Sequence, residues 1–251
     1  MEQSTAVLLQ NLALKYETES FIPSDPVSFP HRWTDKKDIE ISAFTAQWLA
    51  YGKRELFLKV LNSIGAQFGK SPYTYIINRG FENYRGDMSC LYRFYKKHDF
   101  YCLCDTLYNI YAVLGEKKKD MEEVLQTMLH KENITQAKTS DVINLLGKIF
   151  SDVNGIPSES KSACKRLCMF LRWMVRKQSA VDFGIWNIVK PQDLIVPLDV
   201  HVFRQSVQLG LTKRKDASMK TALEITENLK QVFPTDPVKA DFALFGYGVN
   251  A

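Results

Sequence analysis

The sequence predicts an all-α fold, and three observations carry this prediction. Apolar residues recur every three or four positions through most of the chain, as on one face of a helix. Sustained alternation with a period of two, which marks half-buried strands, is hard to find. Glycines follow several of the periodic segments, where helices favour a left-handed residue. The composition, with 45% hydrophobic and 24% charged residues among 251, is that of a globular domain and excludes disordered and fibrous classes.

Irregular segments divide the helical pattern. Residues 1–20 predict an amphipathic helix, and residues 21–33, with three prolines, form a connector. Residues 152–162 and 186–199 are two further irregular stretches. The N-terminus has no basic region or cleavage site of a secretory signal, and no apolar run approaches the roughly 20 residues of a membrane span. We therefore expect a cytoplasmic protein that does not enter the membrane.

Helices are predicted between these connectors. In residues 34–52, Ile41, Phe44 and Trp48 share one face, Thr34 or Asp35 can cap the first turn, and Gly52 can end the helix. The further predicted helices are, in order, 53–69, about 99–114, 119–130, 139–151, 160–177, 200–209 and 217–232.

Several functional classes are excluded or disfavoured by the residues present. The five cysteines include no C-x-x-C pair and no secretory context, so neither disulfides nor zinc are expected. The histidines lack partners at ligand spacing, so we expect no catalytic metal. A Walker-type loop and a convincing G-x-G-x-x-G are missing, which argues against ATPases and dinucleotide enzymes. The net charge of +5 permits a polyanionic partner without requiring one.

Asp199 lies between an apolar stretch and the predicted helix that begins at Val200. At this position it can accept hydrogen bonds from the first-turn amides and act as the N-cap. Such caps are common, so spacing alone favours a structural role.

A second feature is the helical segment 164–177, in which Lys165, Arg172 and Arg176 alternate with apolar and aromatic residues. Long cations on an apolar helix must lie at a rim or a cleft, where stacking and phosphate contacts are available. Pairing of these cations with acidic neighbours is the structural alternative.

The segment PLDVHVFRQSVQLGL, residues 197–211, is similar to the part of the helix-hairpin-helix DNA glycosylase superfamily in which a catalytic aspartate precedes a helix. Residues 222–248 resemble the next two helices of that superfamily, and residues 38–64 resemble its early helix pair. The resemblance runs in order over roughly residues 30–251. Within the superfamily, the chain looks most like a bacterial family of unknown function.

This resemblance implies a fold and a reaction. The fold would be one bilobed helical domain over residues 1–251, with a cleft between two subdomains. Residues 34–150 would form mainly one lobe, while 1–33 and 151–251 would hold the hairpin and the second lobe. The reaction would be removal of a damaged base from DNA, with lyase activity at the abasic site in members that carry a nucleophilic lysine.

The resemblance also assigns roles to individual residues. Asp199 would stabilise positive charge on the sugar, and Lys165 would be the nucleophile, with Lys161 as the fallback. Arg166 beside Lys165 would favour the neutral amine. The expected contacts to nucleic acid are Gly155, Lys161, Arg166, Arg172 and Arg204, and the aromatic residues that could line a base pocket are Tyr51, Trp173 and Trp186.

The same resemblance implies a set of partners and cofactors. DNA would be the partner, and no obligate protein partner is inferred. The sequence holds no cysteine array for an iron–sulfur cluster. No cofactor is expected; members of the superfamily often bind a monovalent cation at the glycine-rich hairpin turn, and this chain has NGIPSESKS there.

The hairpin departs from the superfamily pattern, because NGIPSESKS, residues 154–162, replaces its glycine-rich turn. Gly155 and the amides after it could still form a phosphate-binding nest. This difference favours a second hypothesis, a non-catalytic nucleic-acid-binding protein on the same scaffold. A helical protein with a protein partner is the third. The sequence leaves open which base is removed and whether the target is DNA or RNA.

Overall fold

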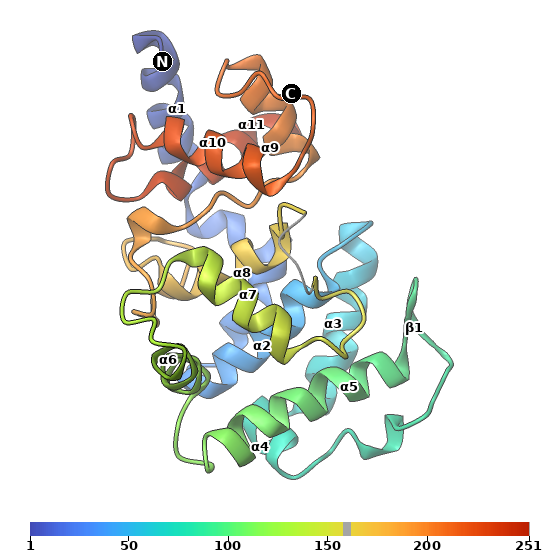
Figure 1. Cartoon of the computed structure of the whole chain (residues 1–251). Coiled ribbons are helices and arrows are strands. Elements are labelled where there is room, and N and C mark those ends of the chain that lie inside the picture. Colours follow the sequence, from blue (N-terminus) through green and yellow to red (C-terminus); the bar gives the residue numbers. More distant parts are fainter. Residues whose placement is uncertain (158–161, 251) are drawn as a thin grey trace. The chain divides into compact units, whose positions relative to one another are not determined.

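The computed structural model describes residues 1–157 and 162–250, and these are mostly helical (Figure 1). The all-α prediction is thus confirmed at the level of secondary structure, with one small hairpin as the exception. The chain divides into two compact units. Unit 1 comprises Met1–Pro23, Gln136–Ile143 and Glu159–Ala251, and unit 2 comprises Ser24–Thr135 and Asn144–Ser158.

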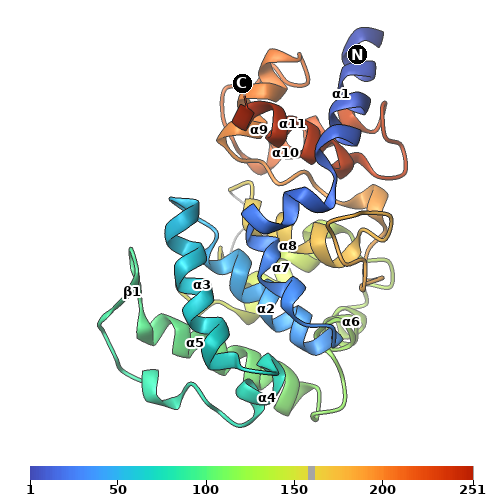
Figure 2. The same ribbon diagram turned by 180° about the vertical axis from the view of Figure 1, so that it is seen from behind.

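Unit 1 is built around its C-terminal helix. The α-helices of this unit are α1 (Gln3–Tyr16), α8 (Lys165–Val175), α9 (Val200–Gln208), α10 (Met219–Leu229) and α11 (Ala240–Asn250), together with the start of α7 (Thr139–Ile149). Helix α11 packs against both α1 and α9, as the two opposite views show (Figures 1 and 2). The contact with α1 requires Gly246, because a Cβ there would lie 2.4 Å from the ring of Tyr16.

Unit 2 surrounds one buried helix. Its α-helices are α2 (Lys36–Leu49), α3 (Arg54–Phe68), α4 (Pro72–Ile77), α5 (Lys97–Tyr108) and α6 (Met121–Lys131), with a π-helical turn at Asn109–Leu114 and the remainder of α7. Strands β1 (Cys90–Tyr92) and β2 (Tyr95–Lys96) form an antiparallel hairpin before α5. Every residue of α2 from Asp38 to Leu49 is buried, so this helix is the centre of the unit.

Short 3-10 helices connect these elements: Glu19–Ser24, Pro26–Ser28, Pro30–Arg32, Glu82–Tyr84, Pro191–Asp193 and Pro237–Lys239. Four of the six begin at a proline, whose fixed φ suits the first turn of a helix.

Polar residues buried with α2 are satisfied by neighbouring segments. The carboxylate of Glu40 accepts hydrogen bonds from the hydroxyl of Tyr111, at 2.8 Å, and from the Met121 amide, at 3.0 Å. Because a buried carboxylate without donors would be costly, these bonds attach the start of α6 to the central helix. At the N-terminus of α2, Asp35 accepts from the Lys37 amide, which confirms the predicted cap.

The structure differs from the sequence-based expectation in two main places. The hairpin was not predicted, because its two strands of three and two residues are too short to show alternation. The helix predicted over 160–177 begins at Lys165 and ends at Val175. None of the helices in the described part of the chain is long and apolar enough to cross a bilayer.

Candidate functional site

Asp199 is the N-cap of α9. Its Oδ1 accepts a hydrogen bond from the Val202 amide at 2.9 Å, as the sequence predicts for a capping aspartate. The preceding residues 194–198 are buried, whereas the Asp199 side chain is 23% exposed. Oδ1 therefore caps the helix, whereas the other carboxylate oxygen, Oδ2, faces a different residue.

That partner is Lys165, the first residue of α8. Its Nζ lies 4.0 Å from Asp199 Oδ2 and 3.6 Å from the sulfur of Met169. Cys164, just before it, adopts a left-handed conformation with φ 46°, which is unfavourable for a residue with a side chain and directs the chain into the helix. The structure thus brings together the amine and the carboxylate that the resemblance singled out.

The face of α8 that carries Lys165 continues with two further cations. Arg172 and Arg176 follow Lys165 at helical spacing, so all three lie along one stripe. Arg172 pairs with Asp182, at 3.3 Å, and with Asp241 of α11. Its side chain is 4% exposed, so Arg172 is an interior residue of unit 1 and its guanidinium is committed to carboxylates. This placement does not provide the DNA contact expected of Arg172.

Arg176 extends the same buried ionic group, because Asp182 pairs with both arginines. Its side chain is 1% exposed and contacts the carboxylates of Asp182, Asp236 and Glu17. The Arg176–Glu17 distance is 2.7 Å, and Glu17 caps the C-terminus of α1. Since an unpaired charge in the interior is costly, this group joins α1 to α8 and keeps the N-terminal helix on unit 1.

Asp241 is a third carboxyl near the Lys165–Asp199 pair, and the sequence analysis did not identify it. Burial raises its pKa to about 6, the positive charge of Arg172 opposes this rise, and the negative charge of Asp199 adds to it. Lys165 also acts on this group, and it lowers the pKa. Asp199 and Asp241 each lie at the start of a helix, but they differ in burial, because the Asp199 side chain is 23% exposed and that of Asp241 is 8% exposed. A lone acid within the apolar segment 238–248 was the signal available in the sequence.

The remaining residues expected to contact nucleic acid differ in exposure and in the unit to which they belong. Arg204 is exposed on α9, and Arg166 is half-buried on α8. Lys161 lies outside the described residues. Gly155 belongs to unit 2 and has φ 85°, and a Cβ at this position would lie 2.0 Å from the hydroxyl of Tyr95. Glycine is therefore required there for packing, whatever its part in binding.

The three aromatic residues suggested for a base pocket are not gathered in one unit. Trp173 and Trp186 are fully buried in unit 1, where Trp186 packs edge-on against Phe170 with ring centres 5.2 Å apart. The indole N–H of Trp173 has no acceptor among the described residues. Tyr51 belongs to unit 2, and its hydroxyl donates to the carbonyl oxygen of Tyr92 at 3.3 Å. As full burial leaves no surface for a base, both tryptophans serve as core residues in this conformation.

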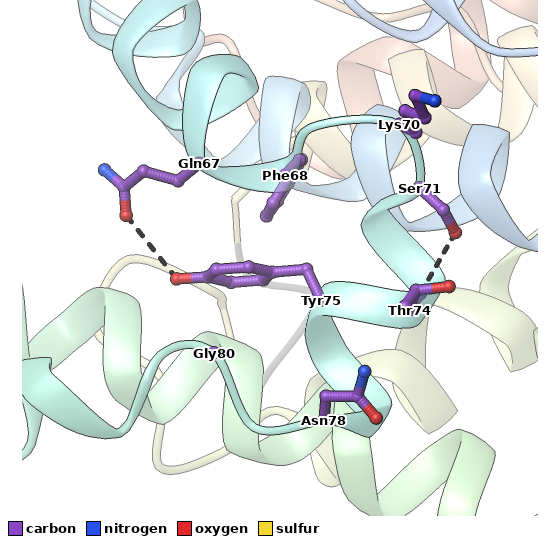
Figure 3. Close-up of a pocket in the computed structure, with 8 residues that line it drawn as sticks. All are labelled: Gln67, Phe68, Lys70, Ser71, Thr74, Tyr75, Asn78 and Gly80. Carbon is purple, nitrogen blue, oxygen red and sulfur yellow. Dashed lines mark hydrogen bonds between the residues drawn. The ribbon is translucent and has the colours of Figure 1, made fainter.

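A surface pocket of about 360 Å³ lies in unit 2, beside the turn between α3 and α4. Figure 3 shows the Tyr75 ring along one wall, with its hydroxyl directed at Gln67. Gly80 allows this arrangement, because a Cβ there would lie 2.6 Å from the ring. None of the residues that line the pocket is among those predicted from the sequence to take part in function. Within the described residues, no group of three or more His, Cys, Asp or Glu side chains is placed to hold a metal ion.

Comparison with known proteins places the chain in a family. Residues 25–250 match the model of the family described as protein of unknown function (DUF2400). Neither the curated proteins nor the solved structures give a significant match. Because the family model covers far more than half of the chain, the protein belongs to the DUF2400 family.

Proposed function

We propose that this protein is a DNA glycosylase that removes a damaged base and then cleaves the strand with Lys165. The observation that carries the proposal is the 4.0 Å distance between Lys165 Nζ and Asp199 Oδ2. The two residues lie at the starts of different helices, α8 and α9, where the sequence resemblance expects the nucleophile and the catalytic carboxylate. The similarity and the geometry support the same pair of residues independently.

The contact between these side chains is a poor candidate for a purely stabilising ion pair. The distance is at the limit of an ion pair, and the two side chains are 30% and 23% exposed. Exposed pairs of this kind contribute roughly 0–1 kcal/mol to stability. Arg172 and Arg176, in contrast, are almost completely buried and closely paired. The Lys165–Asp199 pair is thus the part of the α8 stripe that remains accessible to a substrate.

The chemistry follows from the two groups. With a damaged nucleotide flipped out of the stack, the Lys165 amine, in the unprotonated form that nucleophilic attack requires, forms a bond to C1′ of the sugar. The bond from C1′ to the base breaks, and its electron pair leaves with the base, which takes up a proton. Asp199 stabilises the positive charge that develops on the sugar. Loss of the amine proton and opening of the ring give a Schiff base, which permits elimination of the 3′ phosphate and breaks the strand.

The test is borohydride trapping with an oligonucleotide that contains an abasic site. Borohydride reduces the Schiff base to a stable amine, so wild type should form a covalent adduct whose modified peptide contains Lys165. Lys165→Ala should form none, while Lys220→Ala, a control at an exposed position on α10, should trap normally. Trapping that persists in Lys165→Ala would refute the assignment of the nucleophile.

Asp199→Asn separates the two roles of Asp199. Asparagine caps helices about as well as aspartate, so α9 should keep its stability while the charge is lost. We expect a reduction of base release by about 100-fold or more, in line with the loss of a transition-state electrostatic contact. Full base release in Asp199→Asn, with an unchanged melting temperature, would refute the mechanism.

Binding without catalysis is the second candidate function, and it is favoured by the departure of residues 154–162 from the hairpin sequence of the superfamily. The packing of Gly155 against Tyr95 explains this glycine without a phosphate, and the neighbouring sequence lacks the usual glycine-rich turn. This hypothesis predicts salt-dependent DNA binding with no base release from any lesion. Absence of salt-dependent binding would instead favour a protein partner.

A further inference from the structure

The hairpin of unit 2 presents an exposed aromatic side chain at its tip. The turn between β1 and β2 consists of Arg93 and Phe94, and Phe94 is 76% exposed. In both views the hairpin projects away from the helices next to it (Figures 1 and 2). Among the described residues Phe94 is the most exposed large apolar side chain, so its ring is available for a contact with another molecule.

The hairpin is fixed to the end of α2 and to the turn that follows it by several contacts. The hydroxyl of Tyr92 donates to the Tyr51 carbonyl oxygen at 2.6 Å, and the Phe94 amide donates to the hydroxyl of Tyr51 at 3.4 Å. Tyr95 stacks on Trp48 with ring centres 4.3 Å apart. Tyr92 and Tyr95 are almost fully buried. The base of the hairpin is therefore anchored in the core, and Phe94 is held outward from an ordered support.

Arg93 occupies an unfavourable backbone conformation beside Phe94. Its φ is 52°, which in a two-residue hairpin turn is a position that favours glycine. The guanidinium lies 5.6 Å from the centre of the Tyr51 ring and 6.0 Å from that of Phe94. It passes over Gly52, where a Cβ would come within 2.5 Å of its Nη1. The turn thus keeps a cation next to the exposed ring at a cost in backbone strain.

The charges around the tip favour an anionic partner. Lys53, in the turn that Arg93 covers, is exposed like Arg93 itself. Of the acids next to the hairpin in the sequence, Asp87 pairs with Lys97 at 3.2 Å and Asp99 accepts a hydrogen bond from the Lys96 amide at 2.6 Å, while Glu55 is exposed two residues after Lys53. An exposed aromatic ring with a cation beside it suits a strand of nucleic acid, which offers a π-face and a phosphate at every nucleotide.

We propose that the hairpin tip is a nucleic-acid contact in which Phe94 stacks on an unpaired base and Arg93 contacts the neighbouring phosphate. This inference rests on the nucleic-acid partner of the proposed function, but not on Lys165, Asp199 or catalysis.

Fluorescence anisotropy of the full chain with a labelled single-stranded oligonucleotide tests the proposal. Loss of one stacked base should weaken binding by about 5- to 150-fold in Phe94→Ala, and Phe94→Trp should restore it. Val113→Ala is the matched control, because Val113 is 60% exposed in the same unit and should have no effect. Arg93→Gly suits the turn and should decrease the slope of log Kd against log salt by about 0.7.

Stacking itself is detected with 2-aminopurine in the oligonucleotide. Its fluorescence should fall on binding to wild type and to Phe94→Trp, and should stay high with Phe94→Ala. Equal affinity and equal quenching for wild type and Phe94→Ala would overturn the proposal, as would an equal loss in Val113→Ala or absence of binding by wild type.

The outcomes separate this proposal from the proposed function. Phe94-dependent binding without base release would leave the stacking contact in place and contradict the glycosylase. Base release with binding that is independent of Phe94 would contradict the stacking contact alone.

Discussion

Asp241→Asn should remove a pH-dependent destabilisation from unit 1. The buried Asp241 carboxyl has a pKa of about 6 in the folded protein, compared with 3.8 for an ordinary aspartate. The folded state therefore binds this proton more tightly than the unfolded state. Its contribution to stability is fully present below about pH 3.8 and is lost as the pH rises through about 6.

The expected magnitude follows from the difference between the two pKa values. A shift of about 2 units at about 1.36 kcal/mol per unit corresponds to about 3 kcal/mol over the whole titration. Of this, about 2 kcal/mol falls between about pH 4 and pH 7.5. Asparagine has the same shape and can still accept a hydrogen bond from Arg172, but it does not titrate. The stability of wild type relative to Asp241→Asn should thus decrease by about 2 kcal/mol over this range.

Urea unfolding across this pH range, followed by hydrogen exchange of peptides from α8 and α11, measures unit 1 separately from unit 2. Glu227→Gln is the control, since that side chain is 73% exposed on α10 and should show no comparable pH dependence. A constant difference in unfolding free energy between wild type and Asp241→Asn at every pH would refute this explanation of the buried carboxyl.

Three further predictions concern packing, buried charge and thiol reactivity. Gly155→Ala should destabilise unit 2 by at least about 1 kcal/mol more than Gly86→Ala in thermal unfolding. Both glycines have positive φ, but only at Gly155 would a Cβ meet another side chain; equal effects would contradict the role of Tyr95. Arg176→Ala removes the buried cation that Glu17 and Asp182 share and should cost about 3–5 kcal/mol, with faster hydrogen exchange in α1. Lys177→Ala, at the exposed neighbouring position, should cost little. Unchanged exchange in α1 would show that Arg176 does not hold that helix. Cys90 is exposed and should react with a maleimide in the native protein. Cys104 and Cys168 should react only after unfolding, because burial shields these thiols and raises their pKa values. Mass spectrometry of labelled peptides checks this, and native labelling of Cys104 at the rate of Cys90 would contradict the packing of α5.

Local features of the chain were predictable from sequence because they depend on neighbours within one or two turns. The caps at Asp35 and Asp199 are examples, since each needs only a carboxylate followed by amides of a first helical turn. The short hairpin was missed for the opposite reason: its strands are held by long-range contacts with Trp48 of α2 and with Tyr51 after it, rather than by a pattern of their own.

The sequence alone could not show which of the cations on α8 are buried and which are accessible. The sequence showed Lys165, Arg172 and Arg176 interleaved with apolar residues, but it could not distinguish the accessible lysine from the two buried arginines. The carboxylates that decide this come from other segments, with Asp241 lying 69 positions after Arg172. The environment of Asp241 depends on the same packing.

By itself, the sequence determined the helical class, the main helix positions and the capping role of Asp199, because helical periodicity and capping are local properties. Only the tertiary structure decided that Lys165 lies beside Asp199, that Arg172 and Arg176 are interior residues, and that Phe94 stands exposed on an anchored hairpin. These outcomes depend on burial and on charges distant along the chain, which the folded chain alone brings together.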